Sequence, residues 1–124
     1  MRVLVVEPER RPEAREIDGS FHTMQGIVGG LIQPVYPFDD PVALVCNDEG
    51  KLMNLPAIRG LRDKDGQIYD IIFGTFFLCG GPADCDHFTS LTPEQIKTYQ
   101  EKFYTPEMFW DMDGRIVRLP LKVD

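Results

Sequence analysis

The chain has 124 residues and a formal net charge of −7 at pH 7, because 13 lysines and arginines stand against 20 aspartates and glutamates. This length is typical of one domain, and a hydrophobic share of 43% is enough for a core, which excludes an intrinsically disordered protein. The acidic balance is the wrong sign for a protein that binds phosphate backbones or anionic membranes. We therefore expect no direct contact with nucleic acid and none with a membrane.

The sequence also predicts a compartment. The N-terminal apolar run meets a proline before it is long enough for the core of a signal peptide. The longest apolar stretch, residues 68–78, is interrupted by Asp70 and is much shorter than the roughly 20 residues of a membrane helix. Three cysteines, Cys46, Cys79 and Cys85, are an odd number and indicate reduced thiols rather than a disulfide scaffold. We expect a soluble cytoplasmic protein.

The first half of the chain predicts short strands around one helix. Ser20 is a typical helix N-cap residue, apolar residues follow it at helical spacing, and Gly29 stops the pattern. In chain order the expected elements are strands at 2–7 and 14–17, this helix, and extended segments at 31–38 and 42–47.

The second half predicts one central strand and a second helix. Residues 51–61 are expected to be irregular. The nearly continuous apolar run at 68–78 predicts a strand buried on both faces, with Gly74 as a bulge or a close backbone approach. Thr92 and Pro93 predict the start of a helix that runs to about Tyr104. We expect residues 110–124 to form an edge strand or a loosely ordered tail.

These elements predict one α+β domain over residues 1–124, with a small antiparallel or mixed sheet and two helices. Its oligomeric state stays open, because an exposed edge strand around Val3 or Leu119 would suit pairing across a two-fold axis.

Residues 79–87 gather two thiols, an imidazole and two carboxylates. Structural zinc sites use pairs of ligands two to four residues apart, whereas Cys79 and Cys85 are six apart and no second pair exists. We favour a structural loop, with Cys79, Cys85 and His87 as the alternative metal ligands. A thiol nucleophile would need a base such as His22 or His87 in reach.

No motif in the chain predicts a cofactor. A calcium loop around Gly66 would place Leu61 and Ile72 at its first and last ligand positions, which excludes it. The glycine pairs lack the spacing and the lysine of a phosphate-binding loop. We expect no cofactor.

Polar residues that interrupt apolar stretches are the candidate binding residues. Such residues mark either hydrogen-bonded structural positions, which we favour, or the lining of a pocket. Arg59 and Arg62 suit the carboxylate or phosphate of a ligand, but pairing with Asp63 or Asp70 is the simpler interpretation. The candidates are Asn47, Glu49, Arg59, Arg62, Asp70 and Thr75.

Several motifs resemble those of one family of small proteins. They are VLVVEP (3–8), EIDGS (16–20), VGGLI (28–32), VYPF (35–38), VALVCNDEGK (42–51), IYDII (68–72), GTFF (74–77) and FTSL (88–91). In these motifs the chain resembles domain of unknown function family 3846, from residue 3 to residue 109. The chain departs from that pattern at Ile58, where relatives often carry Asn before the arginine.

The resemblance implies no enzyme activity. It implies an accessory protein of bacterial phages, plasmids and conjugative elements. Our first hypothesis is therefore a non-enzymatic binding or interaction module with a protein or small-molecule partner. The alternatives are an acidic counter-defence protein that occupies a host nucleic-acid-binding protein, and a small cysteine- or histidine-dependent enzyme.

Overall fold

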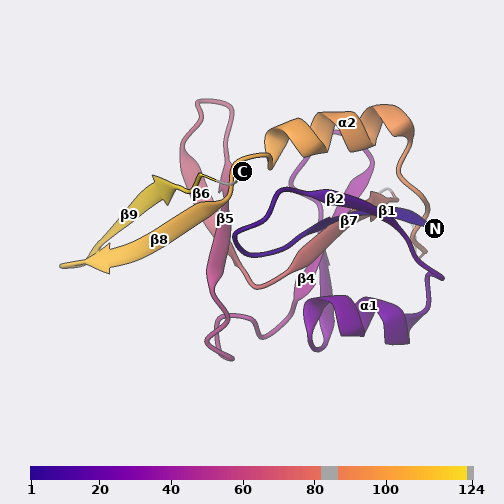
Figure 1. The fold of residues 1–124 in the computed structure, drawn as a ribbon, viewed down its shortest axis with the longest axis horizontal. Helices are drawn as coiled ribbons and strands as arrows, with labels where there is room; N and C mark the ends of the chain where they lie inside the picture. The colour runs from indigo at the N-terminus through magenta and orange to yellow at the C-terminus, as the bar shows by residue number, and fades with distance from the viewer. Residues whose placement is uncertain (82–86, 123–124) are drawn as a thin grey trace.

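The computed structural model describes residues 1–81 and 87–122, and its centre is a five-stranded antiparallel sheet (Figure 1). The strand order in this sheet is β2-β1-β7-β4-β3, and two further two-stranded sheets are β5-β6 and β8-β9. The elements are β1 (Arg2–Val6), β2 (Glu13–Glu16), α1 (Phe21–Val28), β3 (Ile32–Val35), β4 (Val42–Asn47), β5 (Ala57–Arg62), β6 (Ile68–Phe73), β7 (Phe76–Gly80), α2 (Pro93–Lys102), β8 (Glu107–Met112) and β9 (Arg115–Pro120). The expected α+β fold is confirmed.

The two helices cover opposite faces of the main sheet (Figure 1). Strands β1, β4 and β7 lie in its middle, and their residues alternate between the two faces, as the two-residue period of a strand requires. Met24 and Val28 of α1 pack on one face, against a cluster that includes Val5, Val45 and Phe77. Among the described residues, no helix is long and apolar enough to span a bilayer.

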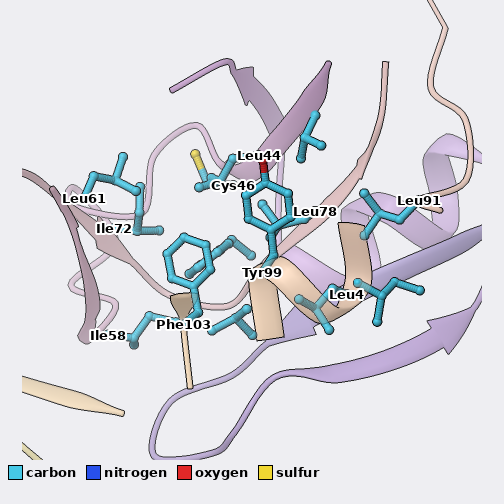
Figure 2. Close-up of a cluster of buried hydrophobic side chains, with 14 residues drawn as sticks. Leu4, Leu44, Cys46, Ile58, Leu61, Ile72, Leu78, Leu91, Tyr99 and Phe103 are labelled. Atoms are coloured by element: carbon cyan, nitrogen blue, oxygen red, sulfur yellow. The ribbon is translucent and has the colours of Figure 1, made fainter. Parts of the chain in front are cut away.

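The opposite face carries the larger apolar cluster, which three elements supply (Figure 2). Leu44 and Leu78 project from the sheet toward α2, and Tyr99 and Phe103 project from the α2 side toward the sheet. The β5–β6 hairpin completes the cluster with residues that include Leu61. The hairpin therefore belongs to the hydrophobic core, although it forms no ladder with the main sheet.

The predicted helix signals are confirmed. The hydroxyl of Ser20 accepts a hydrogen bond from the amide of Thr23, and Gly29 ends α1 with φ of 79°. Thr92 and Gln95 form a reciprocal capping box at the start of α2. Local sequence chemistry is enough to fix both helix starts.

The prediction of one strand over residues 68–78 is wrong. The chain turns at Gly74, whose φ is +85°, so that β6 pairs with β5 whereas β7 becomes the central strand of the main sheet. The predicted irregular segment also contains a strand, β5, with a register shift between Ala57 and Arg59. An apolar run alone does not show where one strand ends and another begins.

The C-terminal hairpin β8–β9 projects away from the body of the molecule (Figure 1). Asp113 and Gly114 link its strands with φ of 54° and 83°, as a two-residue type I′ turn requires. Residues 115–120 are thus a strand, but they pair in a separate hairpin. Val3, by contrast, lies in β1, between β2 and β7, and has no open edge.

We expect Gly74→Ala to lower the free energy of unfolding by about 2 kcal/mol or more. Alanine is strained at the positive φ of this position, and its Cβ would lie only 2.7 Å from Cδ1 of Leu55. Gly114→Ala is the matched control, because its φ is +83° with no atom within 4 Å of the new Cβ, and it should cost about 1 kcal/mol. Urea unfolding measures both values, and equal losses would show that Leu55 moves aside freely.

Candidate functional site

A groove of about 420 Å³ lies between the β3 side of the main sheet and the β5–β6 hairpin. Gln33 and Cys46 form a cross-strand pair and therefore belong to the same face of the sheet, where they line the groove with Val35. Asp70 and Ile72 line it from β6. Its remaining polar or aromatic lining residues are Tyr36, Asn47, Asp48, Lys51, Tyr69 and Phe73.

Two carboxylates dominate the electrostatics of this groove. Burial raises the pKa of the Cys46 thiol, and the nearby charges of Asp48 and Asp70 raise it further. Cys46 itself is buried, whereas both aspartates are exposed. The groove thus has an apolar floor beneath two negative charges, with Lys51 also in its lining.

Asn47 is a structural residue of this groove. Its side chain is buried, its Nδ2 donates to the carbonyl of Val28 at 3.1 Å, and its Oδ1 accepts from the amide of Glu49 at 2.7 Å. It therefore fixes the C-terminal end of α1 to the turn that follows β4. Glu49 itself is exposed and does not line the groove.

Arg59 is fully buried, away from the groove. Its guanidinium donates to three backbone carbonyls, those of Phe103 at 3.1 Å, Ile58 at 2.9 Å and Arg10 at 2.6 Å. Burial lowers the pKa of Arg59 to about 10, which keeps the group charged at neutral pH. These contacts join the β1–β2 turn, β5 and the end of α2.

Arg62 pairs with a residue that the sequence did not single out. The expected partners were Asp63 or Asp70, but Arg62 Nη2 donates to Glu107 Oε2 at 2.7 Å. Glu107 also accepts from Arg118 and, at 3.1 Å, from the amide of Gly60. A single carboxylate therefore connects β5, β8 and β9.

The Glu107 carboxylate is held in its charged form. Burial pushes its pKa upward, but hydrogen bonds from Arg62, Arg118 and the Gly60 amide outweigh burial and lower the pKa overall. The signal in the sequence was the same as for the other candidates, a charged residue that interrupts the otherwise apolar stretch 106–110.

Only two of the six candidates meet in the groove, namely Asn47 and Asp70. Thr75 is half-buried beside Gly74 in the link between β6 and β7 and does not line it. Sequence reasoning missed the aromatic and charged lining. Tyr36, Asp48 and Lys51 lie in turns whose approach to β6 depends on the tertiary fold.

The cysteine segment is only partly described. Cys79 is buried in the cluster under α1, and burial raises its pKa to about 12. His87 is exposed, and Cys85 lies outside the described residues. Within residues 1–81 and 87–122, no three His, Cys, Asp or Glu side chains gather as metal ligands. The metal set of Cys79, Cys85 and His87 stays a prediction.

The acidic turns of the described chain lie apart. Asp39 and Asp40 precede β4, whereas Asp48 and Glu49 follow it, so a whole strand separates the two pairs. Asp111 lies near the tip of the projecting hairpin. A continuous acidic face therefore does not follow from these turns.

A sequence model described as Domain of unknown function (DUF3846) matches residues 1–104. The chain belongs to this family. The resemblance seen in the sequence is thus confirmed, and the match covers the main sheet, the groove and α2 but ends before β8–β9. No curated protein and no solved structure matches the chain.

We expect the two described thiols to react slowly with iodoacetamide at pH 7 in a Cys85→Ser variant. A pKa near 12 leaves Cys79 about a thousandth of the thiolate of a thiol with the ordinary value of 9.0. Mass spectrometry of alkylated peptides gives the rates, and the protein in guanidinium chloride is the control. A native rate at or above that of free cysteine would support the enzyme hypothesis instead.

We expect Glu107→Gln to lower the free energy of unfolding by about 2–3 kcal/mol at pH 7 and by much less at pH 3. The folded-state pKa of Glu107 is depressed, so its contribution is present above the ordinary value of 4.5 and is lost as pH falls through the folded-state pKa. Urea unfolding at both pH values measures the difference.

Glu13→Gln is the control for this pH dependence. Glu13 also pairs with an arginine, Arg15 at 2.7 Å, but on the surface, where solvent screens the pair, so the substitution should leave the free energy of unfolding nearly unchanged at both pH values. A Glu107→Gln loss that is the same at both pH values would contradict the assigned role of the charge.

Proposed function

We propose that this protein is a non-enzymatic binding module whose ligand occupies the groove between β3–β4 and β5–β6. The observation that carries the proposal is the lining of this groove, where Asp48 and Asp70 stand over a buried floor beside Tyr36 and Tyr69. Ligand sites commonly combine apolar lining with a few charged groups that fix orientation. The resemblance supports an accessory role for this binding in a bacterial mobile genetic element.

The lining favours a ligand with a positive charge. Two carboxylates against one lysine leave the groove negative, and the net charge of −7 adds a long-range attraction for cations. The faces of Tyr36 and Tyr69 also attract ammonium and guanidinium groups. We therefore propose a ligand that carries an amine or a guanidinium group on a short apolar chain.

Binding is better supported than cysteine catalysis at this site. Cys46 contributes a thiol to the groove lining, and both its burial and the adjacent carboxylates disfavour the thiolate that would attack a substrate. The same carboxylates would favour a bound cation. The carboxylates beside Cys46 thus disfavour cysteine catalysis and favour the binding of a cation.

Agmatine is a suitable probe, because it joins an amine and a guanidinium through a short apolar chain. We expect it to shift the backbone amide resonances of Gln33, Cys46 and Ile72 in NMR spectra. Asp70→Asn should weaken binding about tenfold, which corresponds to a lost charge-assisted hydrogen bond of about 1.5 kcal/mol. Asp65→Asn, at another exposed aspartate in the turn before β6, should leave affinity within about twofold.

Adipate, a dianion of similar length, is the control ligand. Shifts with adipate but not with agmatine would overturn the proposed ligand class. The absence of groove shifts with either compound, or equal effects of Asp70→Asn and Asp65→Asn, would overturn the groove as the binding site.

A further inference from the structure

The hairpin β8–β9 exposes an unusual amount of apolar surface. Four of its large apolar side chains are between 42% and 66% exposed: Trp110, Met112, Ile116 and Leu119. The hairpin projects from the body and lies beyond the segment that matches the family. Contiguous exposed apolar surface of this kind commonly marks an interaction site.

The outer edge of β9 offers free backbone groups. Along an antiparallel pair of strands, every second residue exchanges backbone hydrogen bonds with its partner. The amide of Leu121 donates to the carbonyl of Pro106, so Leu119 and Val117, two and four residues earlier, are also hydrogen-bonded to β8. The alternate residues, Ile116 and Arg118, therefore turn their amides and carbonyls away from β8. No backbone hydrogen bond within the described chain uses this edge.

The edges of the main sheet do not offer the same opportunity. The backbone amide of Asp48 donates to the carbonyl of Leu31, so the residues of β3 whose backbone groups point away from β4 are Ile32 and Pro34. Pro34 has no amide hydrogen to donate to an added strand. At the other edge, β2 carries charged residues engaged in ion pairs. Both features are known to block strand addition.

We propose that β9 pairs with β9 of a second copy of this chain across a two-fold axis centred on Val117. In this antiparallel register, residues 115–119 of the two copies align, and Ile116 of each copy exchanges backbone hydrogen bonds with Arg118 of the other. This register uses the outward-facing groups identified above. A two-fold axis of this kind is the commonest symmetry of protein dimers.

Charge selects this register over its neighbours. A centre at Arg118 would place two arginines directly opposite each other, which destabilises a strand pair. A centre at Ile116 would align only residues 115–117 of the two strands. With the centre at Val117, Arg115 faces Leu119 of the second copy, and no like charges stand opposite.

The proposed register also joins the exposed apolar side chains. Trp110 is paired with Val117 within the hairpin, so the two-fold axis creates a row in which two valines lie between two tryptophans. On the opposite face, Ile116 of the second copy reaches the side of Arg118. A cavity of about 380 Å³ opens there, lined by residues that include Ile68, Tyr69 and Phe109.

Sedimentation velocity and native mass spectrometry of the full chain across the micromolar range test the proposal. We expect a concentration-dependent dimer, because pairing of two short strands lies at the small end of protein interfaces. Val117→Lys and Val117→Glu should each be monomeric, since like charges would meet at the axis. Mixing the two variants should restore a dimer that contains one copy of each.

The matched control pair is Met112→Lys and Met112→Glu. Met112 lies on the same face of the hairpin as Val117, but at the turn end of β8, one strand away from the axis, so mixing these variants should not change their oligomeric state. A monomeric wild-type chain at every concentration would overturn the proposal. A wild-type dimer whose Val117 variants form no mixed dimer would overturn the register and its axis.

Discussion

The position of the β5–β6 hairpin depends on one buried guanidinium. Arg59 donates to backbone carbonyls that belong to the β1–β2 turn, to β5 and to the end of α2. Within residues 1–81 and 87–122 no carboxylate forms an ion pair with Arg59, although the charge of Glu107 favours its charged form. The carbonyl dipoles replace the water that burial removes. Loss of the guanidinium would leave buried acceptors unsatisfied in three segments at once. Together with the apolar contacts of Ile58, Leu61 and Ile72, this contact fixes the wall that β6 gives to the groove.

Glu107 plays the corresponding role on the outer side of β5. It accepts from Arg62 and Gly60 of that strand, and it accepts from Arg118 of β9. The family match contains Arg62 but ends before Glu107. The hairpin β8–β9 is therefore attached to the family fold by a buried carboxylate whose charge requires donors from both sides. These directional hydrogen bonds contribute to the orientation of the hairpin relative to β5.

The sequence predicted what local chemistry determines. The N-caps at Ser20 and Thr92, the glycine end of α1 and the apolar strand β4 follow from neighbouring residues, and all are present. Gly74 was predicted as a bulge or a close approach but not as the point where the backbone changes sheets, because apolar side chains continue on both sides of it. The groove was predicted only through Asn47 and Asp70, since its other walls come from turns that the fold brings together. Arg59 was correctly identified as a polar interruption, but two of the three carbonyls that accept from it, those of Arg10 and Phe103, are far away in sequence.

The Glu107 carboxylate also explains why the edge of β9 is open to a second strand. Charged side chains on an edge strand normally discourage pairing, and the sequence of β9 contains two of them, Arg115 and Arg118. In the folded chain, however, Arg118 turns inward to Glu107 and no longer screens the edge. Arg115 lies next to the turn, at the end of the strand. Between them, Ile116 and Val117 carry no charge. The interaction that anchors the hairpin to the body thus also removes the charge that would otherwise keep a second strand away.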